Sequence, residues 1–282
     1  MNPLAEYLCP PGFAGPSGLR ALVAEMSILR EAGHLACPRV SRSRPGGGAR
    51  VTSVSSASSV GRQPVLLVPG FLAGDATLRP MASRLRSAGY RTYRSRVHAN
   101  VRCAQATGEG LERRLEDIYD RWERPVAIVG HSLGGLLAKG LAHRRPELVA
   151  GIVTLGSPLL APGAVHPVLA FDLMVLGRLQ RLGFGDLMGS DCTNGECAKM
   201  SWEELSARPP DGFEFTSIYS RRDGIVDWHA CLDPAAMQVE VDCSHVGMAV
   251  DQTVYGHVLQ GLRRIADGGY RPRGRTPEAT AG

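Results

Sequence analysis

The chain has 282 residues, of which 44% are hydrophobic, 6% aromatic and 21% charged, a balance typical of a globular protein with a sizeable core. Its formal net charge is +5, but residues 1–62 carry +4 and residues 271–282 carry +2, so residues 63–270 carry −1. A nucleic-acid-binding protein is expected to carry its basic residues on the folded domain, so nucleic acid is excluded as a partner. Weak attraction of the basic ends to an anionic membrane surface stays open.

The sequence contains no stretch near the roughly 20 apolar residues that a membrane helix needs. Residues 1–15 lack the basic start and apolar centre of a secretory signal, which favours a cytoplasmic location, with peripheral membrane association as an addition. Among the seven cysteines, Cys192 with Cys197, or Cys231 with Cys243, could form a disulfide, but reduced thiols are expected in the cytosol. The cysteine spacings match no paired-ligand pattern for zinc, so no metal is expected.

The first residues in chain order form a separate arm. Apolar residues between Ser17 and His34 recur at helical spacing and predict an amphipathic helix. We interpret residues 1–38 as an N-terminal helical arm and residues 39–63, rich in Ser, Gly and Arg, as a flexible linker. Residues 64–270 then form the main domain, and the basic tail 271–282 is expected to be disordered.

Strand and helix patterns alternate along the main domain. Strand-like runs lie at residues 65–68, 90–97, 126–129, 152–155, 213–219 and 237–241. Helical patterns lie at residues 77–88, 110–122, 133–145 and 252–266. Continuous apolar strands that alternate with helices predict a mainly parallel sheet with helices on both faces, an α/β fold.

One long segment interrupts this alternation. Residues 159–212 contain no predicted strand, and a loop insertion of this length is usually functional. Within the segment, residues 168–182 are apolar on nearly every side of a helix, including Phe171 and Leu176. We predict a mobile helical lid or cap over an acyl-binding pocket; an ordinary buried helix that caps the core is the alternative.

The strongest motif is Gly130-His131-Ser132-Leu133-Gly134, which fits the G-x-S-x-G nucleophile elbow. A buried strand directly precedes it and a helix directly follows it, as this sharp turn requires. Ser132 is therefore the predicted nucleophile. The predicted donors to the oxyanion are the backbone N–H groups of Leu133 and of Phe71, which follows Pro69-Gly70 at the end of the first strand.

The acid and the base should follow the nucleophile in the order Ser, Asp or Glu, His. Asp223 lies in the turn after the strand at residues 213–219, and Asp227 is the alternative four residues later. His245 follows the last predicted strand. Because the carboxyl ends of parallel strands share one edge of the sheet, His245 and Asp223 are expected beside Ser132.

These motifs resemble the α/β-hydrolase superfamily, in particular its bacterial serine lipase and esterase branch. The resemblance covers about residues 65–262 and rests on Pro69-Gly70-Phe71-Leu72, Gly130-His131-Ser132-Leu133-Gly134-Gly135, Leu155-Gly156-Ser157-Pro158 and Ser244-His245-Val246-Gly247. It implies an eight-stranded core sheet, a lid between Gly156 and Phe213, and no cofactor. Two departures are Pro69, where many lipases have His, and Asp227, where Pro often follows the Ile-Val pair.

The expected function is hydrolysis of carboxylic esters through an acyl-enzyme formed on Ser132. The apolar insertion favours medium or long acyl chains, with Leu72, His131, Phe171 and Leu176 as predicted substrate-binding residues. The expected partner is a small-molecule or lipid acyl ester, with transient contact with a lipid interface. Acyl transfer or thioester hydrolysis by the same residues is the alternative activity, and a catalytically inactive binding module is the alternative from another class.

Overall fold

The computed structural model describes residues 8–25 and 63–268. Within the arm, helix α2 (Leu19–Glu25) occupies the start of the predicted amphipathic segment. The rest of that segment, the linker up to residue 62 and the tail 271–282 lie outside the described residues.

A single parallel sheet forms the centre of the main domain. Its strands are β1 (Pro64–Val68), β2 (Arg91–Arg94), β3 (Val126–His131), β4 (Val149–Leu155), β5 (Glu214–Ser220) and β6 (Met237–Val241). They lie in the order β2-β1-β3-β4-β5-β6, and every neighbouring pair is parallel. The expectation of eight strands is wrong for the described part of the chain. The sequence itself contains six strand-like runs, and each forms one of the six strands.

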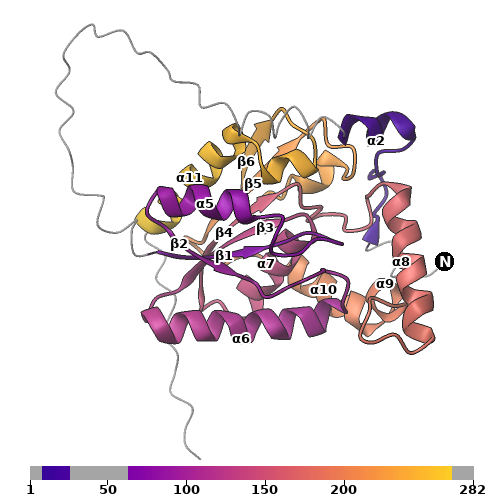
Figure 1. The fold of residues 1–282 in the computed structure, drawn as a ribbon, viewed down its shortest axis with the longest axis horizontal. Helices are drawn as coiled ribbons and strands as arrows, with labels where there is room; N and C mark the ends of the chain where they lie inside the picture. Colours follow the sequence, from indigo (N-terminus) through magenta and orange to yellow (C-terminus); the bar gives the residue numbers. More distant parts are fainter. Residues whose placement is uncertain (1–7, 26–62, 269–282) are drawn as a thin grey trace, which may run out of the picture.

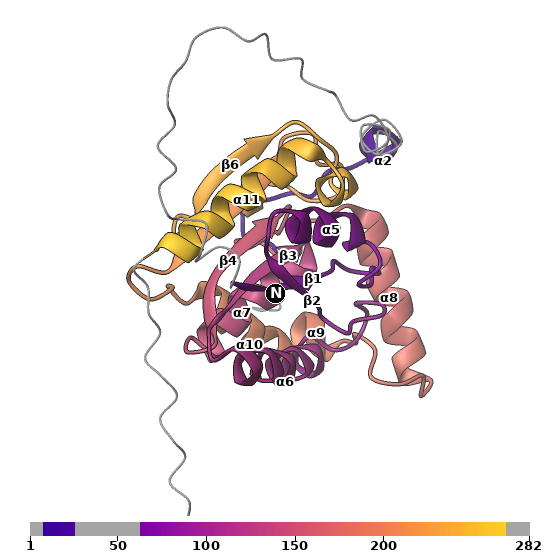
Figure 2. The same ribbon diagram turned by 60° about the vertical axis from the view of Figure 1, so that its left-hand side comes forward.

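Helices cover both faces of this sheet (Figures 1 and 2). On one face lie α5 (Arg79–Ser87) and α11 (Gln252–Asp267), and on the other lie α6 (Ala104–Trp122) and α7 (Leu133–Arg144). Alternate residues of a strand point to opposite faces. Val65 and Leu67 of β1 therefore join the core under α5 and α11, whereas Leu66 and Val68 join the core under α6 and α7.

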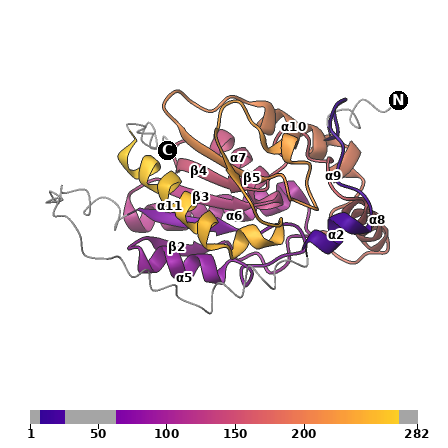
Figure 3. The same cartoon turned by 90° about the horizontal axis from the view of Figure 1, so that it is seen from above.

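The insertion between β4 and β5 is helical, as its sequence predicted. It contains α8 (Pro167–Arg181), α9 (Asp191–Asn194) and α10 (Glu196–Ser206). Figure 3 shows α8 and α2 beyond one end of the sheet, away from the helices that cover its faces. No residue of α8 is buried, so the alternative of a buried helix that caps the core is wrong. The helix lies outside the layered core, and within residues 8–25 and 63–268 no second layer buries its apolar residues.

None of the helices in residues 8–25 and 63–268 combines the length and the apolar character that crossing a bilayer requires.

Candidate active site

Ser132 lies in the sharp turn between β3 and α7, as the elbow motif predicted. Its φ of 54° and ψ of −122° belong to a backbone region that residues other than glycine rarely adopt. Its N–H donates to the Leu155 carbonyl at 2.8 Å, which ties the turn to the end of β4.

The glycines on either side of Ser132 allow this turn to close. A Cβ on Gly130 would lie 2.4 Å from the Gly134 carbonyl oxygen, and a Cβ on Gly134 would lie 2.2 Å from the Val68 carbonyl oxygen. Both distances are far shorter than a van der Waals contact, so each position requires glycine. The elbow is thereby pressed against the end of β1.

The structure brings Asp223, rather than Asp227, to His245. Asp223 Oδ2 and His245 Nδ1 are 2.6 Å apart, and the two side chains are only 1% and 5% exposed. The other carboxylate oxygen of Asp223 accepts the backbone N–H groups of Ile225 and Val226 at 2.9 and 2.7 Å. Asp227 instead contacts the His229 ring.

The environment of His245 sets its charge and its tautomer. Burial opposes a charged ring, but the negative charge of Asp223 and its hydrogen bond outweigh burial and raise the pKa of His245 above its ordinary value. Because an ionised carboxylate only accepts hydrogen bonds, Nδ1 donates to Asp223. In the neutral ring, Nε2 is then the nitrogen that can accept a proton.

Ser132 and the His245–Asp223 pair both lie at the turn that ends β4. Gly156 has a φ of 54°, and a Cβ there would lie 2.9 Å from His245 Nδ1 and 3.1 Å from Asp223 Oδ2. The preceding residue, Leu155, accepts the Ser132 N–H. The loops after β3, β5 and β6 therefore converge on the end of β4, which is the edge that the sequence predicted.

The residues of the predicted oxyanion donors, Phe71 and Leu133, line the same cavity as Ser132. The N–H of Leu133 is the first of α7, a position without an acceptor inside its own helix. Phe71 pairs with Asn100 in an isolated bridge, and Asn100 Nδ2 donates to the Pro69 carbonyl at 2.8 Å. Asn100, which sequence reasoning missed, thus holds the Phe71 loop in place.

His131 supports His245 instead of lining the cavity. Its Nε2 is 3.0 Å from the His245 carbonyl oxygen, and the two rings are 4.9 Å apart between centroids. Burial, together with the positive charge of His245, lowers the pKa of His131 to about 4. The ring is therefore neutral near pH 7 and donates to that carbonyl.

Leu72, also predicted to bind substrate, is 53% exposed and lies outside the cavity lining.

A cavity of about 570 Å³ extends from Ser132 toward the insertion. Its apolar wall is formed by Phe71, Leu133, Leu136, Leu137, Leu169, Leu173, Met174, Trp202 and Leu205. On α8 the lining residues recur at helical spacing, from Leu169 through Leu173 to Gly177. Phe171 and Leu176, the predicted substrate-binding residues of this helix, are not among the lining residues.

The described residues able to hold a metal are Cys103, Cys192 and Cys197, of which Cys192 lines the cavity.

Glu25 of the arm is a second residue that sequence reasoning missed. Its Oε1 accepts the N–H groups of Gly224 and His245 at 2.8 and 3.0 Å, and its Oε2 accepts that of Val246 at 3.0 Å. One carboxylate therefore holds the loop that carries Asp223 and the loop that carries His245. No local pattern marks Glu25, because its partners lie about 200 residues away.

The described part of the arm, residues 8–25, approaches these loops closely at several points. A Cβ on Gly224 would lie 2.2 Å from the Ala21 carbonyl oxygen, so this glycine is required for the contact. The N–H of Ala14 donates to Asp227 Oδ2 at 3.2 Å, while Asp227 Oδ1 holds His229 Nδ1 at 2.7 Å. Asp227 thus anchors the arm instead of orienting His245.

Sequence comparisons match parts of this chain. Residues 110–179 match a family model described as a PGAP1-like alpha/beta domain. A pyrethroid hydrolase of Sphingobium wenxiniae is 32% identical over 109 residues, which are 35% of this chain and 37% of the relative. The matched stretch therefore spans little more than a third of that relative.

Solved structures share the fold over most of the domain. A lipase of Bacillus licheniformis superposes with a TM-score of 0.54 at 15% identity, over 72% of this chain and 92% of the lipase. A soluble variant of the monoglyceride lipase of Saccharomyces cerevisiae superposes with a TM-score of 0.52 at 14% identity, over 73% and 86%. With its parallel sheet and its elbow between β3 and α7, the chain has the fold of these lipases, and its partial sequence matches are similar to α/β-hydrolase domains.

Proposed function

We propose that this protein is a serine hydrolase of carboxylic esters, an esterase or lipase. The observation that carries the proposal is the 2.6 Å contact between the buried His245 and Asp223, at the same end of the sheet as a serine in a strained elbow. Such a set is what nucleophilic acyl transfer requires: a hydroxyl, a base next to it and a carboxylate that orients the base. The names of the relatives, two lipases and a pyrethroid hydrolase, support the same class of reaction.

In the first half of the reaction, His245 Nε2 takes the proton of Ser132 Oγ as this oxygen attacks the ester carbonyl. The negative charge that develops on the carbonyl oxygen is stabilised by the backbone N–H groups of Leu133 and Phe71. The protonated His245 then gives its proton to the leaving alcohol, and the acyl group remains on Ser132. Asp223 stabilises the charged ring during this step.

In the second half, water replaces the alcohol. His245 takes a proton from water, which attacks the acyl carbonyl and forms the same kind of tetrahedral intermediate. The intermediate collapses when His245 returns the proton to Ser132 Oγ, and the carboxylic acid leaves. His131, neutral near pH 7, keeps the backbone of His245 in place through both steps without adding a second positive charge.

The shape of the cavity favours an acyl chain as the group bound next to Ser132. About 570 Å³ of mainly apolar space lies against the nucleophile, sufficient for a medium or long chain. Each methylene removed from water contributes about 0.8 kcal/mol, roughly a fourfold gain in binding. We therefore propose medium to long acyl esters as substrates, held by Leu169, Leu173 and Met174 of α8.

We also propose that helix α8, within the predicted lid segment 159–212, acts as the moving part of a lid. Helix α8 forms one wall of the cavity yet buries none of its own residues, so few contacts oppose its movement. Its other face exposes Phe171 and Val175, which are 59% and 37% exposed. Opening at a lipid interface would cover this apolar face and admit the acyl chain.

A series of p-nitrophenyl esters of increasing chain length tests the proposal, with Ser132→Ala as the control. We expect kcat/KM to rise with chain length, and we expect a fluorophosphonate probe to label wild-type protein and to leave Ser132→Ala unlabelled. Absence of labelling in folded wild-type protein would contradict the proposal. Adding a primary alcohol separates hydrolysis from acyl transfer, because a transferase would give mainly the new ester.

A further inference from the structure

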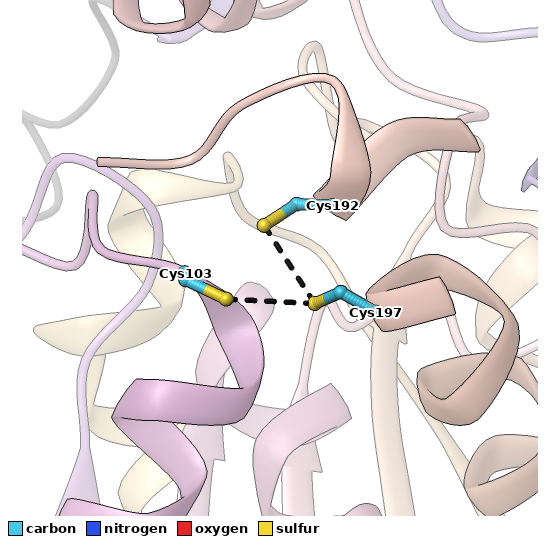
Figure 4. Close-up of side chains that lie close together, drawn as sticks. All are labelled: Cys103, Cys192 and Cys197. Atoms are coloured by element: carbon cyan, nitrogen blue, oxygen red, sulfur yellow. Dashed lines mark hydrogen bonds between the residues drawn. The ribbon is translucent and has the colours of Figure 1, made fainter. Parts of the chain in front are cut away.

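Three cysteine side chains converge where the insertion meets the core (Figure 4). Cys103 immediately precedes α6, Cys192 lies in α9, and Cys197 lies in the first turn of α10. The Cys197 sulfur is 3.6 Å from the Cys103 sulfur and 3.6 Å from the Cys192 sulfur. All three sulfur atoms lie within 4.8 Å of one another.

The spacing of these sulfur atoms fits shared coordination better than a disulfide. Zinc binds cysteine sulfur at about 2.3 Å, and tetrahedral geometry then separates neighbouring sulfur atoms by about 3.8 Å. The two distances of 3.6 Å are close to this value. A disulfide has a bond of about 2.05 Å and uses two sulfur atoms. The meeting of three thiols within 4.8 Å, with Cys197 at 3.6 Å from both others, therefore favours a shared metal ion.

Backbone N–H groups point at two of the three sulfur atoms. The backbone N–H groups of Ala104 and Gly189 face the Cys192 sulfur, and that of Gln105 faces the Cys197 sulfur. Ala104 and Gln105 begin α6, a helix of 19 residues whose N-terminus carries partial positive charge. Three thiolates with a divalent ion have a net charge of −1, which these dipoles stabilise. Backbone N–H···S contacts also orient metal-binding thiolates.

The two segments that bring the thiols together are joined independently of any metal. The N–H of Cys103 donates to the Asp186 carbonyl at 3.0 Å, and the N–H of Met188 donates to the Val101 carbonyl at 2.8 Å. Arg102 forms an ion pair with the Asp186 carboxylate at 3.0 Å. The cluster is therefore assembled by the fold, so a metal ion would bind without a large rearrangement.

We propose that Cys103, Cys192 and Cys197 bind one zinc ion as three thiolates, with water in the fourth position. Soft thiolate ligands select zinc over the harder divalent ions. Three thiols lose three protons to solvent as the ion binds, and no electron is transferred. The ion would join α9 and α10 to the start of α6. Because Cys192 also lines the cavity, this link would hold the adjoining part of the cavity wall in place. No zinc-binding pattern is visible in the sequence, because Cys103 lies far along the chain from the other two cysteines.

Metal titration of the whole chain tests this site directly. The protein is purified under reducing conditions without chelator, analysed for zinc, stripped of metal and titrated with Co²⁺. We expect about one zinc per chain as purified, thiolate-to-cobalt charge-transfer absorption that saturates at one equivalent, and its loss when Zn²⁺ is added. Cys103→Ser, Cys192→Ser and Cys197→Ser should each weaken zinc affinity by more than the roughly 10–100-fold that loss of an outer partner costs.

Cys9→Ser is the matched control, because the Cys9 thiol bonds the Phe13 carbonyl outside the cluster. This variant should bind metal like the wild type. Absence of thiolate-to-cobalt absorption in wild-type protein, or a Cys192–Cys197 disulfide found by mass spectrometry in freshly purified protein, would overturn the proposal. Neither measurement depends on a variant that folds poorly. Ser132→Ala should bind zinc like the wild type, because Ser132 is not a ligand. The zinc measurement is therefore independent of the esterase measurement, and failure of the esterase proposal would not contradict the zinc site.

Discussion

The two walls of the cavity are built in opposite ways. On the sheet side, Ser132, Asp223 and His245 are each at most 7% exposed and are tied to backbone groups of neighbouring loops. On the insertion side, α8 buries no residue and exposes several large apolar side chains. Bond formation requires reacting groups held to a fraction of an ångström. Acyl binding requires only apolar area, which a loosely packed helix can supply.

This difference predicts how mutations on the two sides should behave. Changes on the sheet side should lower the rate for every ester by similar factors, because all esters share the reacting atoms. Changes on the insertion side should alter the preference among esters and leave short substrates nearly unaffected. The experiments below test that division.

The largest effect is expected from Ser132→Ala and His245→Ala. Each should lower kcat for a p-nitrophenyl ester by on the order of 10⁴–10⁶, because the nucleophile and its base act as one unit. The double variant should be little slower than either single variant. If His245→Ala kept more than about a tenth of wild-type kcat, the base would have to be another residue.

Asp223→Asn should lower kcat by on the order of 10³–10⁴, because an amide can select the wrong tautomer of His245. Asp227→Asn is the matched control. Its carboxylate holds His229 and Ala14, so most of the activity should remain. The reverse ranking of these two variants would assign the acid role to Asp227.

The pH profile gives a second measure of the same pair. Because Asp223 raises the pKa of His245, the acid limb of kcat/KM should lie above the ordinary histidine value of about 6.5. Only the neutral ring can act as base, so activity is lost as pH falls through this limb. In Asp223→Asn the residual activity should show the limb at lower pH, because the carboxylate that contributes most to opposing burial is then lost. An unmoved limb would mean that another group titrates.

A smaller loss is expected from Glu25→Gln. The variant removes the charge from a carboxylate that accepts three backbone N–H groups, and such charge-assisted bonds contribute about 1.5–3 kcal/mol each. Loosening the loops of Asp223 and His245 should lower kcat about 10–100-fold at similar KM. The negative charge of Glu25 also helps to raise the pKa of His245, so the acid limb should move slightly to lower pH.

Arg20→Gln is the control for Glu25, since Arg20 is exposed on the same helix α2. Its kcat and its pH profile should match the wild type. If Glu25→Gln instead raised KM alone, or changed nothing, the arm would be only a peripheral contact.

The residues that the sequence identified are those whose roles depend on local geometry. Ser132 was marked by glycines that its own turn requires, and Asp223 and His245 by their positions after successive strands. The six strands of the sheet followed from six strand-like runs. The two additional strands, which came only from the resemblance, are absent from the described residues.

The residues that the sequence missed act through contacts distant along the chain. Glu25 and Asn100 look like ordinary polar residues until the fold brings them to His245 and Pro69. The sequence also did not show which face of α8 would line the cavity. Its apolar residues surround nearly the whole helix, so periodicity alone did not show that Leu173, rather than Phe171, would line the cavity.

The smallest expected effect comes from α8 and depends on the face that is changed. Leu173→Ser removes an apolar contact with a bound acyl chain, which costs about 1.5 kcal/mol, or roughly tenfold in kcat/KM for long esters. Acetate esters do not reach Leu173, so their hydrolysis should change little. Phe171→Ser, on the exposed face, should leave the chain-length preference in dilute solution unchanged. Equal losses for all esters in Leu173→Ser, together with a lower Tm, would show that α8 supports the fold instead of binding the acyl chain.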